Sequence, residues 1–147
     1  MARPLTITAS GNAQVDTADY QFATGSALFD GSGDYLTVDN LTFSGDYTVE
    51  FWAKPDAATA LQVAVRIGHW TGSGWDNECV FQFRGSSAPS FKSRWYVILA
   101  DGSLGLNNTA GGGGVWSHIA ISRSGTTTRF FIDGSLIQST TGSNYWW

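Results

Sequence analysis

The chain carries little charge, and the charge that it carries is not basic. Charged side chains make up 14% of the 147 residues, compared with about 25% in an average soluble protein, and the formal net charge is −4. The two lysines and six arginines are scattered along the sequence. A nucleic-acid-binding protein needs clustered cationic side chains to neutralise phosphates, so this function is excluded.

Cysteine and long apolar runs are also scarce. Cys79 is the only cysteine, which rules out a disulfide within the chain and a cysteine-based zinc site. The opening residues, MARPLTITAS, lack the apolar core of a secretory signal peptide. No apolar run approaches the roughly 18 residues of a membrane-spanning helix. We therefore expect neither a conventional signal peptide nor insertion into a membrane.

Short β-branched and aromatic runs, ended by Gly, Ser or Asp, dominate the sequence. Residues 47–55 alternate, so that Val49, Phe51 and Ala53 share one face while Glu50 and Trp52 share the other. Similar runs occupy residues 61–68, 79–85, 91–100, 115–125 and 126–140. No window has helical apolar spacing over the length of a helix. The pattern predicts an all-β fold, either an antiparallel sandwich or a barrel, in one domain.

Three Asp-Gly steps separate such runs, at Asp30-Gly31, Asp101-Gly102 and Asp133-Gly134. Asp-Gly readily adopts the positive φ values of a type I′ hairpin turn. We expect tight two-residue hairpins at the last two steps and a looser reversal around residues 30–34. The glycine-rich residues 109–116 lead into a strand and lack Gly-Lys-Ser/Thr, so we interpret them as a loop and not as a phosphate cradle.

Three longer stretches occur in an informative order: GSALFDGSGDYLTV, FSGDYTVEFWAKPD and WSHIAISRSGTTTRFFIDGSLI. Together they closely resemble the laminin-G-like branch of the concanavalin A-like lectin/glucanase superfamily. The resemblance covers most of residues 20–140 and implies a jelly-roll β-sandwich. It also implies that Trp52 and Trp116 are packing anchors, that Pro55 ends a strand and that His118 is a hydrogen-bonded structural residue.

Two features extend or limit this resemblance. Family members usually continue past the Asp133-Gly134 hairpin with one or two more strands, whereas this chain stops at TGSNYWW. We therefore expect residues 1–147 to form a single sandwich domain without its usual last strands, either as a fragment or completed by a partner. Residues 4–31 resemble the lead-in of phage structural proteins that carry this module, which suggests a virion or an extracellular surface as the location.

The superfamily includes glucanases, so catalysis has to be tested on the residues. The glucanase motif places acids along one strand as Glu-x-Asp-x-x-Glu, but no acid follows Glu50 at those positions. Asp76 and Glu78 are two residues apart, without the third acid. We predict that the protein is not an enzyme; a degenerate glycoside hydrolase is the minor alternative.

Non-catalytic glycan binding is the leading prediction. Residues 69–78, HWTGSGWDNE, combine aromatic rings, which can stack on the apolar face of a sugar, with carboxylate and amide groups, which can bind its hydroxyls. Trp75, expected in a loop, is the strongest candidate; its alternative role is to fold back over the end of the sandwich. The full set of candidates is Trp70, Trp75, Asp76, Asn77, Asn107 and Asn108. Calcium is the possible cofactor, held by Asp76, Asn77 and Glu78.

A purely structural role in a particle, as a capsid decoration or a tail or fibre component, is the second prediction. Tyr145, Trp146 and Trp147 would form an unusual apolar patch if exposed to water, and such patches mark interfaces. The partners would then be other virion or assembly subunits, in an oligomer or larger particle. The two predictions are compatible, because a virion protein can present a module that binds a cell-surface polysaccharide.

Overall fold

The computed structural model describes residues 4–39, 41, 43, 45–59, 61–70, 72–73, 75–88, 94–99, 102–104 and 112–142, with the side chains of 69, 70, 75–77 and 102–104 left out. The chain divides into two compact units, Met1–Thr42 and Phe43–Trp147, and each is described by itself. That all 147 residues form a single domain stays a prediction. Within the described ranges, no helix has the length and apolarity needed to cross a membrane.

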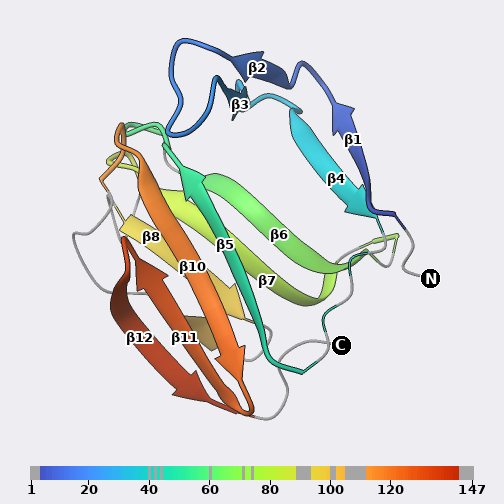
Figure 1. The fold of residues 1–147 in the computed structure, drawn as a ribbon, viewed down its shortest axis with the longest axis vertical. Coiled ribbons are helices and arrows are strands. Elements are labelled where there is room, and N and C mark those ends of the chain that lie inside the picture. Colours follow the sequence, from blue (N-terminus) through green and yellow to red (C-terminus); the bar gives the residue numbers. More distant parts are fainter. Residues whose placement is uncertain are drawn as a thin grey trace. The chain divides into compact units, whose positions relative to one another are not determined.

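The second unit contains two four-stranded antiparallel sheets (Figure 1). One has the strand order β12-β11-β10-β5, from β5 (Tyr47–Ala53), β10 (Ser117–Ser124), β11 (Thr127–Ile132) and β12 (Ser135–Thr141). The other has the order β6-β7-β8-β9, from β6 (Gln62–Trp70), β7 (Trp75–Arg84), β8 (Arg94–Leu99) and β9 (Gly102–Leu104). The predicted all-β antiparallel fold is confirmed.

The core of this unit lies between the two sheets. Strands β8 and β11 alternate strictly between half-buried and buried positions, as expected when one face of a sheet is covered. Phe51 packs edge-on against Phe81, with ring centroids 5.3 Å apart, and against Trp95 at 6.2 Å. The buried cluster draws on both sheets: Cys79, Phe81, Phe83, Trp95, Val97, Leu99, Ile119, Ile121, Phe130 and Ile132. This is the arrangement of a β-sandwich.

The Asp133-Gly134 hairpin is confirmed. Both residues have positive φ, 49° and 76°, and Ile132 lies opposite Ser135, which leaves a two-residue loop. At the Asp101-Gly102 step the expected turn position is wrong by one residue. Gly102 belongs to β9 and lies opposite Leu99, while Asp101 lies outside the described residues.

The first unit contains two small antiparallel sheets. Strand β1 (Thr6–Ser10) pairs with β4 (Tyr35–Asp39), and β2 (Gln14–Asp16) pairs with β3 (Ser26–Leu28). The expectation that the strands flanking Asp30-Gly31 pair with each other is therefore wrong. The carboxylate of Asp34 accepts hydrogen bonds from the backbone N–H groups of Asp30 and Asn12. This fastens the loop after β3 to the turn after β1, so that the chain enters β4 beside β1.

Candidate functional site

The predicted glycan-binding residues lie at the tip of the β6–β7 hairpin. In the antiparallel register Trp70 lies opposite Trp75, and His69 lies opposite Asp76. The expectation that Trp75 and Asp76 lie in a loop is wrong, because β7 begins at Trp75. Residues directly opposite in an antiparallel pair share one face of the sheet and have Cβ atoms about 5 Å apart. The backbone thus brings four residues that the sequence places up to seven positions apart into two adjacent rungs.

The predicted calcium ligands continue along β7. A register shift falls between Ile67 and His69, so that Asn77 and Glu78 oppose Gly68 in a bulge. The Glu78 carboxylate lies 3.6 Å from Nε of Arg66, and both side chains are about one-third exposed. The Arg66 guanidinium would therefore compete with a metal cation for the Glu78 carboxylate. No group of three His, Cys, Asp or Glu side chains that could hold a metal occurs in the part of the chain that the structure describes, which leaves out the side chain of Asp76.

The other predicted site residues lie outside the described residues. They are Asn107 and Asn108, predicted as further glycan contacts, and Tyr145, Trp146 and Trp147, predicted as an interface.

A site that the sequence prediction missed lies on the outer face of the β12-β11-β10-β5 sheet. Trp52 lies opposite His118, and their ring centroids are 5.3 Å apart at an interplanar angle of 39°. Nε2 of His118 lies 3.6 Å from a carboxylate oxygen of Glu50. Trp52 is 37% exposed, so its expected role as a packing anchor of the core is wrong. The alternation predicted for residues 47–55 already placed Trp52 on the face opposite to Phe51, but its pairing with His118 follows only from the register of β5 with β10.

The match to a family model decides which group of proteins this sandwich belongs to. The model, described as the concanavalin A-like lectin/glucanases superfamily, matches residues 30–147. The chain belongs to this superfamily. The laminin-G-like families within it are generally non-catalytic and often bind carbohydrates, although the superfamily also includes glycosidases. No curated protein and no solved structure matches the chain.

The two glutamates of this concanavalin A-like protein belong to strands of different sheets, Glu50 to β5 and Glu78 to β7. Each has a cationic or imidazole partner 3.6 Å away, His118 and Arg66 respectively. Packed sheets are about 10 Å apart, and Glu50 points away from the core, so the two carboxylates do not form the close pair of a retaining glycosidase.

The outer face of the other sheet of the concanavalin A-like sandwich carries polar side chains. The guanidinium of Arg84 lies 4.9 Å from the ring centre of Tyr96, a cation–π contact. At the centre of this face, however, Val80 and Gln82 are only 3% and 4% exposed. This face therefore offers no open surface at Val80 and Gln82.

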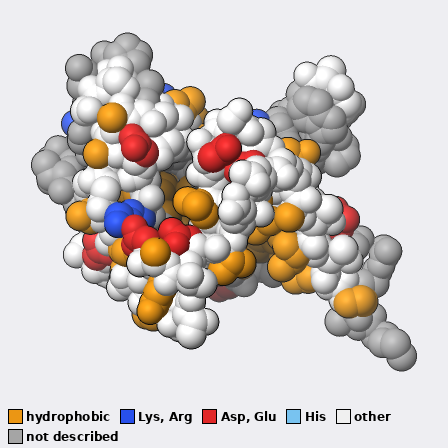
Figure 2. Space-filling view, turned by 90° about the horizontal axis from the view of Figure 1, so that it is seen from above, with side chains coloured by type: hydrophobic (Ala, Val, Ile, Leu, Met, Phe, Trp, Pro, Cys, Tyr) orange, Lys and Arg blue, Asp and Glu red, His pale blue; other side chains and the backbone are white. Residues whose placement is uncertain are grey.

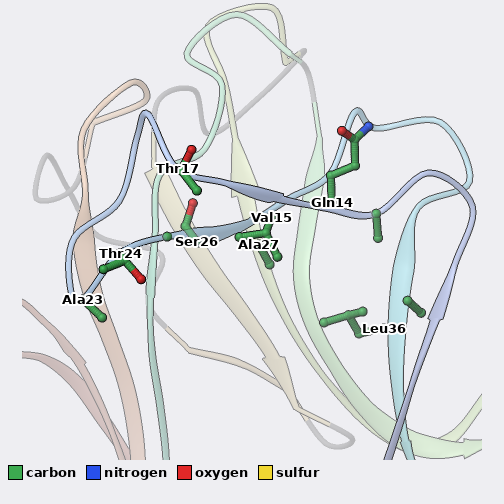
Figure 3. A pocket seen from close by; sticks show the side chains of 11 residues that line it. Gln14, Val15, Thr17, Ala23, Thr24, Ser26, Ala27 and Leu36 are labelled. Carbon is green, nitrogen blue, oxygen red and sulfur yellow. The ribbon is translucent and has the colours of Figure 1, made fainter.

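In the first unit, the two small sheets line an open hollow of about 520 Å³ (Figure 3). Val15 and Ala27 are partners in the β2–β3 register and line it together with Leu36 of β4. Threonine, serine and glutamine side chains lie at its border: Gln14, Thr17, Thr24 and Ser26. None of the residues predicted to bind a ligand, metal or partner lines this hollow.

Proposed function

We propose that this protein is a non-catalytic carbohydrate-binding module whose site is the tip of the β6–β7 hairpin. The observation that carries the proposal is the register, which pairs Trp70 with Trp75 and His69 with Asp76. Membership of a superfamily that often binds carbohydrates supports the same ligand class. The separation of Glu50 from Glu78 supports a role without hydrolysis.

The chemistry of these two rungs suits a sugar. An indole ring offers a flat apolar surface to the C–H face of a pyranose, and a neighbouring carboxylate or amide accepts hydrogen bonds from its hydroxyls. The register places two tryptophans on adjacent strands at the hairpin tip, and Asp76 follows Trp75 on the next rung.

The test is glycan binding by a Trp75→Ala variant on an array of neutral and acidic cell-surface polysaccharides. We expect the variant to lose retention while its melting temperature stays close to that of the wild type. Tyr35→Ala is the matched control, because Tyr35 is an aromatic residue of β4 that is 54% exposed. Unchanged retention of Trp75→Ala would remove the hairpin tip as the site.

Calcium is the cofactor that this hairpin would take, through Asp76, Asn77 and Glu78 as carboxylate and amide ligands. The same array, run with and without a chelator, tests this part of the proposal separately. Loss of retention in the chelator supports a calcium-bridged sugar. Full retention in the chelator removes calcium and leaves direct contact with the hairpin.

A second role, assembly into a larger particle such as a virion, is favoured by the surface of the first unit. Among the residues that the structure describes, eleven of the sixteen exposed large hydrophobic side chains come from residues 5–41, and none of the buried hydrophobic ones does. Figure 2 shows hydrophobic side chains in several patches on the visible surface, among few charged ones. Apolar surface of this kind marks interfaces. Light scattering tests the role: an oligomer supports assembly, with Tyr145, Trp146 and Trp147 as further candidate contacts, and a monodisperse monomer contradicts it.

A further inference from the structure

We propose that the outer face of the β12-β11-β10-β5 sheet carries a second saccharide site, centred on Trp52 and distinct from the hairpin tip. Its ligand is a neutral polysaccharide chain that lies across the strands. This inference rests on the proposed function, namely that the protein binds glycans, but it depends on different residues.

The backbone of β5 sets up the site. Glu50 and Trp52 are two residues apart on a strand, so they point to the same face, and β5 is at the edge of its sheet. Trp52 is 37% exposed although a sandwich of this size has room to bury indoles, as it does with Trp95 at 2%. The Trp52 ring is held by the tilted imidazole of His118 at 5.3 Å. A flat aromatic surface is thus presented to solvent in a fixed orientation.

The polar groups beside the ring fit a polyol. The Glu50 side chain is 62% exposed and has one oxygen 3.6 Å from Nε2 of His118, which itself is 26% exposed. The backbone of His118 is fixed through Asp133, whose carboxylate accepts a hydrogen bond from His118 N at 2.8 Å. A carboxylate next to an aromatic platform accepts hydrogen bonds from sugar hydroxyls. Beside Trp52 this negative charge disfavours uronic or sulfated sugars, so we assign a neutral sugar to the ring.

The face extends beyond one sugar ring. Glu50 lies opposite Ala120, Ala120 lies opposite Phe131, and Phe131 lies opposite Leu136. This row crosses all four strands, and neighbouring strands are about 4.8 Å apart. Ala120, a small residue in the middle of the row, is only 6% exposed, so a ligand would pass over it, whereas Leu136 is 55% exposed at the far end. A chain of several sugars that starts on Trp52 therefore meets apolar surface again at Leu136.

A cationic ligand such as a quaternary ammonium group is the alternative that the same chemistry raises, because it also favours indole and carboxylate groups. Such ligands are held within several aromatic rings. Here the indole lies on the face of a sheet, beside the imidazole of His118. The flat geometry favours a sugar ring, and choline serves as the probe that tests the alternative.

The experiment is affinity electrophoresis of the full chain in gels that contain hydroxyethylcellulose, xylan or mannan, followed by calorimetry with oligosaccharides of increasing length from the polymer that retards it. Trp52→Ala should weaken binding about tenfold or more, since most of the stacking surface is lost. Glu50→Gln should weaken it less, and Leu136→Ser should weaken it only for long oligosaccharides. Leu61→Ala, which removes a side chain 52% exposed outside this face, is the matched control. Trp52→Phe, which retains an aromatic ring, should keep part of the affinity that Trp52→Ala loses. This would show that the loss in Trp52→Ala comes from the missing ring and not from misfolding.

The outcomes distinguish the two proposals. If Trp75→Ala abolishes retardation and Trp52→Ala has no effect, the second site is overturned and the proposed function stands. If no neutral polysaccharide retards the wild-type protein and no glycan on the array retains it, both the proposed function and the second site are overturned. If choline binds and Trp52→Ala abolishes that binding while no polysaccharide retards the wild type, the ligand class proposed for this face is wrong.

Discussion

His118 and Asp133 exchange two hydrogen bonds at the end of the β10–β11 pair. The backbone N–H of His118 donates to Oδ1 of Asp133 at 2.8 Å, and the backbone N–H of Asp133 donates to the carbonyl oxygen of His118 at 2.8 Å. The same aspartate has a φ of 49°, in the left-handed region that Asp and Asn tolerate better than most residues. One side chain thus closes the hairpin and fixes the strand that carries His118.

Replacing Asp133 by alanine should destabilise the domain by about 1–2 kcal/mol, because it removes an acceptor and places an alanine at positive φ. Asp133→Asn keeps an oxygen acceptor and the conformational tolerance, so its effect should be smaller. Urea denaturation of both variants measures the difference. Equal losses in the two variants would show that neither the hydrogen bond nor the φ angle matters.

The aromatic contact between Phe51 and Phe81 joins the two sheets. Phe81 is fully buried, and its ring meets that of Phe51 edge-on at 82°. Phe81→Ala should lower the free energy of unfolding by about 3–5 kcal/mol, since a large cavity opens between the sheets. Phe81→Leu fills most of that space and should cost less. A small effect of Phe81→Ala, measured by denaturant unfolding, would mean that the sheets are not held together at this point.

The sequence predicts the local turns and strands of this fold well, but it predicts poorly which strands pair with each other. The Asp133-Gly134 turn was predictable because its φ preferences are carried by the two residues themselves. The pairing of β3 with β2 depends on residues far along the chain, and the Asp-Gly step at residue 30 suggested a hairpin instead. Similarly, tryptophan content pointed to residues 69–78, whereas the Trp52 platform appears only when β5 and β10 are in register.

Asp46 makes stability depend on pH. Its carboxylate accepts hydrogen bonds from the backbone N–H of Gly125 and the hydroxyl of Ser124, which hold its pKa below the usual value. A group with a lowered pKa in the folded state stabilises that state above its unfolded pKa of about 3.9, and this contribution is lost as the pH falls through the folded value.

The variant Asp46→Asn removes this titration but keeps an oxygen acceptor. We expect it to be less stable than the wild type near neutral pH and to approach the wild type as the medium is acidified below about pH 4. Thermal unfolding over a pH series measures the difference in melting temperature between the two proteins. A difference that stays constant from neutral to acid pH would contradict the assigned role of the carboxylate. High salt should narrow it, because Asp46 is exposed.

Cys79 is a chemical reporter of the sandwich core. It is fully buried in β7, and burial, with a smaller contribution from Glu78, raises the pKa of its thiol. Both effects suppress the thiolate, so a thiol reagent should leave the native protein unlabelled and react completely after unfolding. In the Phe81→Ala variant, whose cavity lies two residues along the same strand, β7 should open more often and labelling should be faster. Rapid labelling of the native wild type would show that Cys79 is accessible and would contradict the burial of its side chain between the two sheets.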